Sequence, residues 1–313
     1  MDPVQSLKLF SKHAFRRDSP LDKDMNQSNR AIEIAKGLPL ALEVIGSLLC
    51  RTKKENWDGK LKEWEKIPPE DVLSKLKISY DALRDHEQRI FLDIACLFIG
   101  HEKDVMIYFW DDSRFFPKEA MDVLENMSLM KIDDNKKVWM HDLVRDLGRE
   151  IVHQESKLKI EEQSRVWDPE EALGLLRTQK KKKKLEALRL RLDRQRPFAY
   201  EDFKRLPNLS LLEVCGSTGG FCAEESRLWL ESLSNVSPTN EDLHLLPQLR
   251  WLSWHYIPPT FKITNFSMED VVILDLSRSN ITHEWQGWSH MKVSFMVGKT
   301  HYFILSHLKV IFA

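Results

Sequence analysis

The sequence contains few cysteines, and none of them forms a pattern typical of a metal site or a disulfide framework. Its four cysteines are Cys50, Cys96, Cys215 and Cys222. No C-x-x-C pair and no histidine cluster occurs among them, so we expect neither zinc nor disulfides. Cys50 and Cys96 lie in apolar helical contexts and are predicted to be small buried side chains. This cysteine usage indicates a reducing compartment. We expect the cytoplasm, with the nucleus as the alternative.

The sequence also lacks a long apolar segment and an excess of either charge. The best apolar run, IFLDIACLFIG at 90–100, is short and includes Asp93, so we expect no membrane span. The N-terminal segment has no long apolar region of the kind found in secretory signals. The 47 Lys and Arg residues nearly balance the 48 Asp and Glu residues, whereas general nucleic-acid binders are usually more basic. A chain of 313 residues with 42% hydrophobic content predicts a globular protein of two or three domains.

No recognisable catalytic centre is present. We find no motif for a serine or cysteine nucleophile, no HExxH and no paired carboxylates in a known frame. The segment FMVGKT at 295–300 ends like a phosphate-binding loop, but Val293 stands where that loop requires glycine. We therefore predict that the chain is not an enzyme and holds no catalytic metal.

The first 150 residues show helical spacing of apolar side chains. In residues 28–50 two apolar helical patterns are interrupted at Gly37-Leu38-Pro39-Leu40. Glycine suits the left-handed position after a helix end, and proline suits the first turn of the next helix. The segment is therefore a sharp helix–helix joint. Such a joint can be a plain corner, or its proline-fixed backbone can lie against an adenine ring.

Residues 67–160 show the pattern of a winged helix. After Ile67-Pro68-Pro69, helices are predicted at 72–83, at 87–98 and at about 118–128. Two short strands about an Asp-Asn turn and a final helix from Asp142 follow. A winged helix can read DNA, but the candidate recognition helix carries three acidic residues that would repel phosphates: Glu119, Asp122 and Glu125.

The dipeptide His141-Asp142 marks the start of that final helix. Asp142 is predicted to cap it, and Leu143, Leu147 and Ile151 share its apolar face. His141 has two readings. It can be an incidental neighbour of the cap, or it can donate to a diphosphate at the helix N-terminus, where free amides favour anions.

The last third of the chain repeats one apolar frame. Residues 206–214, 246–254 and 268–276 each carry apolar side chains at the first, fourth, seventh and ninth positions, and 185–192 partly follows them. This is the leucine-rich-repeat frame, in which each unit supplies one strand to a curved solenoid. The step from 206 to 246 is nearly twice an ordinary repeat, which indicates an insertion or degenerate repeat at 216–245. The preceding run Lys180–Lys184 is typical of a solvated linker, with a nuclear signal or nucleic-acid contact as alternatives.

These stretches, in this order, resemble plant intracellular immune receptors of the TIR–NB-ARC–leucine-rich-repeat class. The resemblance covers about residues 3–290. It is carried by seven segments: SLKLFSKHAF at 6–15, GLPLAL at 37–42, LKISYDAL at 76–83, FLDIACLFIG at 91–100, WMHDLVRDLGREIV at 139–152, SRVWDPEEAL at 164–173 and LRWLSWHY at 249–256.

The resemblance implies a nucleotide-linked role for two of these segments. In this family the histidine of the Met-His-Asp motif contacts the β-phosphate of ADP in the resting state, which points to His141 between Met140 and Asp142. The proline of the Gly-Leu-Pro-Leu motif lies by the nucleotide, which points to Pro39 and, around it, Gly37, Leu38 and Leu40. The family's TIR domain, Gly-rich phosphate loop and magnesium-binding aspartate have no counterpart in these residues. Any ADP binding would therefore be weak, and TIR or ATPase activity is not expected.

The sequence thus predicts a mainly α N-terminal half, a helical bundle plus a winged helix, followed by a short α/β leucine-rich-repeat solenoid. The expected divisions are a helical part of NB-ARC (1–66), the winged helix with its Met-His-Asp motif (67–160), a lysine-containing linker (161–185), the repeats (186–290) and an atypical tail (291–313).

The expected function is that of a regulatory and interaction module in ADP-dependent autoinhibition and defence signalling. Its expected partners are other receptor domains, and a pathogen effector or guarded host protein at the repeats, without DNA or membrane. The alternatives are a winged-helix nucleic-acid binder that uses Lys180–Lys184, and a non-functional pseudogene product.

Overall fold

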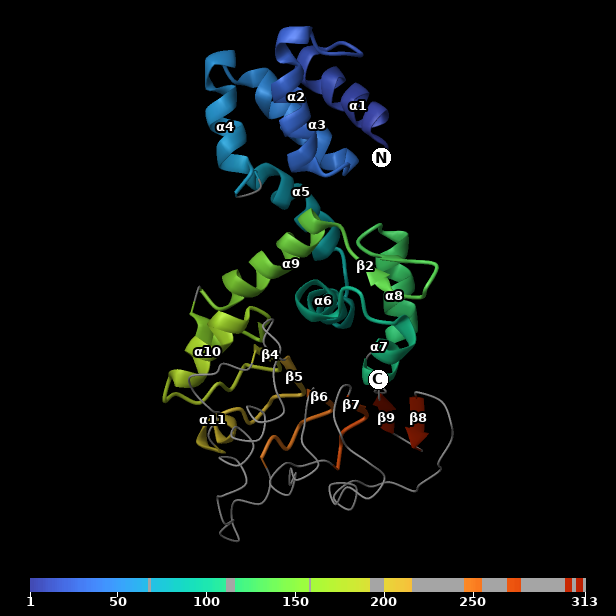
Figure 1. Cartoon of the computed structure of the whole chain (residues 1–313), viewed down its shortest axis with the longest axis vertical. Helices are drawn as coiled ribbons and strands as arrows, with labels where there is room; N and C mark the ends of the chain where they lie inside the picture. Colours follow the sequence, from blue (N-terminus) through green and yellow to red (C-terminus); the bar gives the residue numbers. More distant parts are fainter. Residues whose placement is uncertain are drawn as a thin grey trace. The chain divides into compact units, whose positions relative to one another are not determined.

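The computed structural model has a helical N-terminal region followed by a parallel sheet, as the sequence predicts at this level (Figure 1). It describes residues 1–66, 69–110, 116–157, 159–191, 200–215, 245–254, 269–276, 302–305 and 308–311. The contacts divide the chain into two compact units. The first comprises Met1–Ala95, Glu119–Asp133 and Trp139–Arg149, and the second comprises Cys96–Lys118, Asp134–Val138 and Glu150–Ala313.

The first unit is built from helices whose apolar faces meet. They are α1 (Pro3–Phe15), α2 (Met25–Ala35), α3 (Pro39–Arg51), α4 (Trp57–Trp64), α5 (Glu70–Asp81) and α6 (Asp85–Asp93). Phe10 and Ala14 of α1 are buried, as is the stripe of α3 that contains Ala41 and Ile45. Gly46 lets α1 and α3 approach closely, because a Cβ there would lie 2.8 Å from the Cβ of His13.

The predicted helix at 87–98 changes its hydrogen-bonding pattern part of the way along. The α-helical part, α6, ends at Asp93, and Ile94–Phe98 continues as a π-helix. The wider turn suits this sequence because Ile94, Ala95 and Phe98 are all buried. A further helix, α7 (Lys103–Trp110), was not predicted. Its six apolar residues among eight show no clear helical period.

The remaining winged-helix elements follow the predicted order. They are α8 (Pro117–Asn126), β1 (Lys131–Ile132), β2 (Val138–Trp139) and α9 (Asp142–Glu155). Leu143, Leu147 and Ile151 of α9 are buried, as their spacing predicts. Gly148 lies on this face, and the Cβ of Ala95 is so close that no side chain fits between them.

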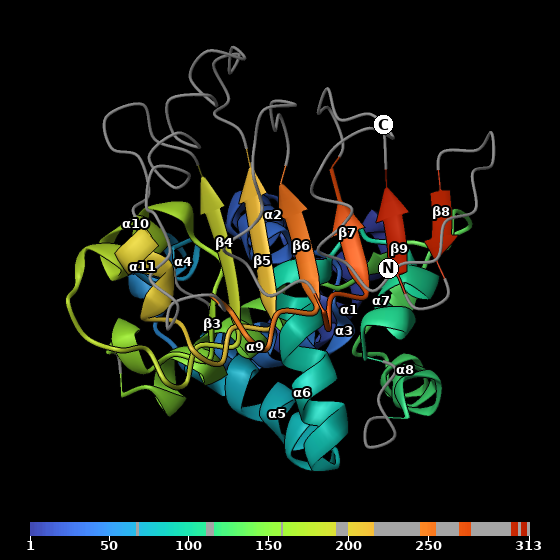
Figure 2. The same cartoon turned by 90° about the horizontal axis from the view of Figure 1, so that it is seen from below.

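The second unit contains a parallel sheet whose strands lie side by side in Figure 2. The order is β3 (Arg165–Val166), β4 (Ala187–Arg191), β5 (Leu211–Cys215), β6 (Trp251–Trp254), β7 (Ile273–Asp275), β9 (Leu308–Ile311) and β8 (Tyr302–Leu305), with only β8 antiparallel. Leu212 pairs with Leu252, and Leu252 pairs with Leu274. The seventh positions of the three repeat frames are therefore in register, so the frame correctly predicts strand positions and alignment.

The two faces of the strands differ in character. Leu212, Val214, Leu252 and Trp254 point into one apolar cluster together with Leu274. Alternate residues of the same strands lie on the other face, where Arg189 pairs with Glu213 at 2.9 Å. On that face Trp251 packs against residues of the same unit that precede the sheet in the chain: Phe98, His101 and Phe109. At Trp251 this second face is therefore covered by aromatic side chains.

Residues 161–185, expected as a linker, carry regular structure. They include β3, which pairs with β4, and α10 (Pro169–Arg177), capped by the Asp168 carboxylate. Ala172 and Leu175 of α10 belong to the apolar cluster of the sheet. The burial of this helix makes the segment part of the second unit.

Two cysteines among the described residues differ in exposure. Cys50, predicted to be buried, is exposed, because it lies in the last turn of α3, about 100° around the helix from the buried Leu49. Cys96 is buried as predicted.

Among the helices that the structure describes, none is long and apolar enough to cross a membrane. The segment FMVGKT at 295–300 and the proposed insertion at 216–245 lie outside the described residues, apart from Leu245.

The packing of Gly148 generates a stability prediction. A Cβ at Gly148 would lie 2.5 Å from the Cβ of Ala95 and 3.2 Å from Cε1 of Phe91. We expect Gly148→Ala to destabilise the protein by about 1–3 kcal/mol, because overpacking outweighs the gain in helix propensity. The thermal unfolding midpoint measures this effect.

Gly174 of α10 provides the matched control, since a Cβ there meets nothing within 4 Å. Gly174→Ala should raise stability by about 0.5–1 kcal/mol through helix propensity alone. Equal midpoint shifts for the two variants would contradict the packing described for Gly148.

Candidate functional site

The joint between α2 and α3 has two consecutive residues in the left-handed region. Lys36 has φ 47° and Gly37 has φ 75°. The left-handed Gly37 and the position of Pro39 as the first residue of α3 confirm the predicted joint. Lys36 adopts this conformation without being glycine, at a cost of order 1 kcal/mol. The turn places the carbonyl of Lys36 beyond the helix end, where it can accept a bond from another part of the chain.

His141 supplies that bond. Its Nε2 lies 3.1 Å from the carbonyl oxygen of Lys36, although the two residues are 105 positions apart. Its Nδ1 lies 3.2 Å from the backbone nitrogen of Leu143, which can only donate. Nδ1 is therefore the unprotonated acceptor, and Nε2–H is the donor to Lys36. The Gly37–Leu40 joint and the Met-His-Asp motif, which sequence reasoning treated separately, thus meet in the first unit.

Asp142 has a different role from the one predicted. It is the first residue of α9, and the side chain that accepts from the first turn is that of His141. The prediction that Asp142 caps the helix is therefore wrong. Its carboxylate instead forms an ion pair with the Lys36 ammonium and accepts from Arg145 Nη1 at 2.8 Å. His141 takes the cap position because its ring nitrogen reaches the Leu143 amide.

The charges at this contact follow from burial and from the neighbouring groups. Burial is the main cause that lowers the pKa of His141, while its bond to Lys36 and the charge of Asp142 oppose the shift. The hydrogen bond from Lys36 is the main cause that lowers the pKa of Asp142. At neutral pH the contact therefore joins a neutral imidazole, an ionised carboxylate and an ammonium group. The neutral imidazole has one N–H to donate, and the Lys36 carbonyl accepts it.

The other predicted residues lie around this contact. Met140 is buried at 2% exposure and anchors the residue before His141 in the core. Pro39 is exposed, and Gly37, Leu38 and Leu40 are half-buried. The Gly37 carbonyl accepts a bond from the Met1 ammonium at 3.2 Å. The exposed edge of the joint thus carries the Lys36 ammonium beside the donor of His141.

Lys36 is the residue that sequence reasoning missed. It stands at the end of α2, where cations are common, yet both its carbonyl and its ammonium contact the Met-His-Asp motif. No local signal could have shown this, because the partners are brought together only by the fold.

The lysine run, the basis of the nucleic-acid alternative, is largely committed to internal contacts. Lys180 and Lys184 pair with Glu161 and Glu162, each at 3.2 Å. Lys182 is fully buried and donates to the carbonyl of Thr178 at 2.6 Å, and burial lowers its pKa. Three of the five lysines of the run therefore have partners within the chain.

Comparison with known proteins defines the class. Residues 84–156 match the winged-helix domain of Roq1-like disease resistance proteins. The segment includes α6, the π-helix and α9 with the Met-His-Asp motif.

The chain is related to the plant disease resistance proteins over nearly its whole length. It is 31% identical over 294 residues to disease resistance protein RPV1 of Vitis rotundifolia, which is 90% of this chain and 21% of that protein. It is 30% identical over 311 residues to disease resistance protein RRS1 of Arabidopsis thaliana, again 90% of this chain and 21% of that protein. It is 36% identical over 163 residues to TMV resistance protein N of Nicotiana glutinosa, covering 52% of this chain and 14% of that protein.

These relatives confirm the resemblance of this chain to TIR–NB-ARC–leucine-rich-repeat disease resistance proteins. The chain spans about a fifth of the length of the relatives that it matches over 90% of its own residues.

The electrostatics of the contact generate a pH prediction. The His141 pKa is lowered on folding, so the unfolded chain binds more protons between the folded pKa and about 6.5. Stability should therefore fall as the pH drops below about 6.5, until the folded-state pKa is reached. A proton-detected NMR titration of the His141 ring should give a pKa below 6.5.

The neighbouring carboxylate provides a further test of the same site. Asp142→Asn should lower the His141 pKa further, because the negative charge of Asp142 favours the imidazolium. Asp81→Asn, at an ion pair on α5, is the matched control and should leave it unchanged. An increase in the His141 pKa in Asp142→Asn would contradict this account.

Proposed function

We propose that this chain is a regulatory module of a plant immune receptor, in which the His141–Lys36 contact acts as a latch between the Met-His-Asp motif and the α2–α3 joint. The observation that supports this proposal is the 3.1 Å bond between His141 Nε2 and the Lys36 carbonyl. A single imidazole proton serves this bond, so any competing acceptor changes the contact. Such a change can bias two arrangements of the chain.

ADP is the proposed ligand that competes for this proton. Bound at the joint, ADP would supply a diphosphate, a stronger acceptor than a peptide carbonyl. His141 Nε2–H would donate to it, and the Lys36 ammonium would offset part of its charge. Pro39, exposed at the start of α3, would offer a flat surface to the base. The first turn of α9 adds the positive end of a helix.

The parallel sheet is proposed to be a short leucine-rich-repeat solenoid. In its support, the apolar frame of the repeats coincides with the strands β5, β6 and β7 and with their pairing. A solenoid of this kind offers a surface for a pathogen effector, a guarded host protein or another receptor domain. We propose that the chain acts through such contacts, without catalysis and without a metal ion.

Binding of ADP tests the nucleotide part of this proposal. We expect isothermal titration calorimetry to show weak ADP binding, with a dissociation constant on the order of 0.1–1 mM (−5 to −4 kcal/mol). His141→Ala should weaken it about tenfold or more, because a hydrogen bond to a charged group contributes about 1.5–3 kcal/mol.

The matched control is His153→Ala. His153 lies on the same helix but meets Trp167 edge to face, with ring centroids 5.0 Å apart, so its loss should leave ADP binding unchanged. Absence of ADP binding to the wild-type chain would reject the nucleotide role. The latch between His141 and Lys36 has its own test.

Signalling tests the latch. In a receptor that joins this segment to a complete nucleotide-binding core, His141→Ala should raise cell-death signalling without an elicitor, because the resting arrangement loses a bond. The readout is ion leakage from transformed leaves at matched protein levels. Signalling equal to that of the wild type would reject the latch.

A further inference from the structure

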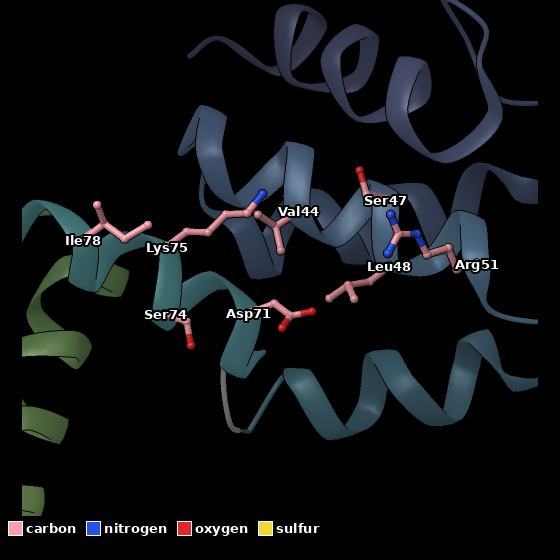
Figure 3. A pocket seen from close by; sticks show the side chains of 8 residues that line it. All are labelled: Val44, Ser47, Leu48, Arg51, Asp71, Ser74, Lys75 and Ile78. Carbon is pink, nitrogen blue, oxygen red and sulfur yellow. The ribbon is translucent and has the colours of Figure 1, made fainter.

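A groove lies between α3 and α5 in the first unit, away from the latch (Figure 3). Its volume is about 480 Å³. It is lined by Val44, Ser47, Leu48 and Arg51 of α3, and by Asp71, Ser74, Lys75 and Ile78 of α5. Nothing in the sequence pattern or in the proposed function accounts for it.

The lining residues form one stripe on each helix. On α3 and on α5 they recur at i, i+3, i+4 and i+7, which is the spacing of the helix face that packs against another helix. Val44 supplies a buried floor, whereas Ile78 is 69% exposed at one end. An apolar side chain that exposed on a helix stripe gains from being covered. The shape and spacing of the groove therefore fit a helix.

The charges on the α5 stripe are separated and lack partners within the part of the chain that the structure describes. Asp71 and Lys75 are four residues apart, yet they form no ion pair among the described residues. Lys77 and Asp81, at the same spacing on the same helix, pair at 2.6 Å. Figure 3 shows the reason: the Lys75 side chain extends toward Val44, while the Asp71 carboxylate points toward the Leu48 end.

We infer that the occupant of this groove is the α5 helix of a second copy of this chain. Two α5 helices that cross antiparallel about a two-fold axis near Leu73 place Asp71 of each opposite Lys75 of the other. The stripe is thus self-complementary, as a two-fold interface requires. The same arrangement carries Ile78 of each copy toward the Leu48 end of the partner groove and removes it from water. This inference does not rest on the proposed nucleotide function.

Arg51 separates this dimer from the docking of an acidic helix of another protein. It lies at the same end of the groove as Asp71 (Figure 3), where the partner's Lys75 would arrive. In the dimer the positive charge of Arg51 repels the partner's Lys75, so removing Arg51 should strengthen association. An acidic helix would instead use Arg51 and Lys75 together and would lose affinity without Arg51.

Sedimentation equilibrium of the full chain at low salt tests the dimer. We expect a monomer–dimer equilibrium with a dissociation constant on the order of 0.1 mM, as suits a small interface. Asp71→Lys and Lys75→Asp should each weaken it about tenfold or more, because each places like charges opposite one another twice. Arg51→Ala should tighten it severalfold.

Charge exchange provides the control for misfolding. The double variant Asp71→Lys/Lys75→Asp should dimerise again, and an equimolar mixture of the two single variants should form a heterodimer. The double variant Lys77→Asp/Asp81→Lys, on the same helix but off the stripe, should behave like the wild type. Circular dichroism checks that each variant is folded.

Two results would overturn the inference. One is a wild-type chain that stays monomeric up to about ten times the expected dissociation constant. The other is association that persists in Asp71→Lys, or that the charge exchange fails to restore.

Discussion

In the first unit one carbonyl group, that of Lys36, joins the α2–α3 joint to the start of α9. This carbonyl is not used within α2, because two left-handed residues, Lys36 and Gly37, follow that helix. Lys36 carries the strain of the conformation, since it is not a glycine. The carbonyl accepts from His141, and the ammonium of the same residue pairs with Asp142. One residue thus holds both polar groups of the Met-His-Asp motif. The backbone carbonyl accepts from the histidine, and the side-chain ammonium pairs with the aspartate.

The π-helix at Ile94–Phe98 also presents carbonyl groups that accept hydrogen bonds from residues distant in the chain, in each of the two units. Its wide turn leaves carbonyls that arginines satisfy: Arg149 of α9 reaches the Ala95 carbonyl at 3.3 Å in the first unit. In the second unit Arg189 of β4 reaches the Leu97 carbonyl at 2.6 Å and holds Glu213 at 2.9 Å. Guanidinium groups suit this position because they remain charged and can bond two acceptors in fixed geometry. Such π-turns within helices are frequent where a function is located.

The sequence predicted those features that depend on local pattern. The joint at Gly37 and Pro39, the buried face of α9 and the aligned strand frame all rest on spacing and turn chemistry, and the structure confirms them. It did not predict the cap by His141, the π-helix, or the exposure of Cys50. Each of these depends on which side of an element meets another one, which spacing alone does not specify. The contact of Lys36 with His141 depends on two segments that are distant in the chain, and so it could be found only in the fold.

The register of the sheet has a consequence for how such proteins change over time. Leu212 aligns with Leu252 across a long stretch of chain, and Leu252 aligns with Leu274 across a much shorter one, with the same partners on both sides. Alignment therefore depends on the strands themselves and is indifferent to the length of chain between them, since closing a longer loop costs little extra entropy. Insertions and deletions between strands can accumulate without disturbing the apolar cluster. A protein of this architecture can therefore vary its loops while its apolar core stays the same.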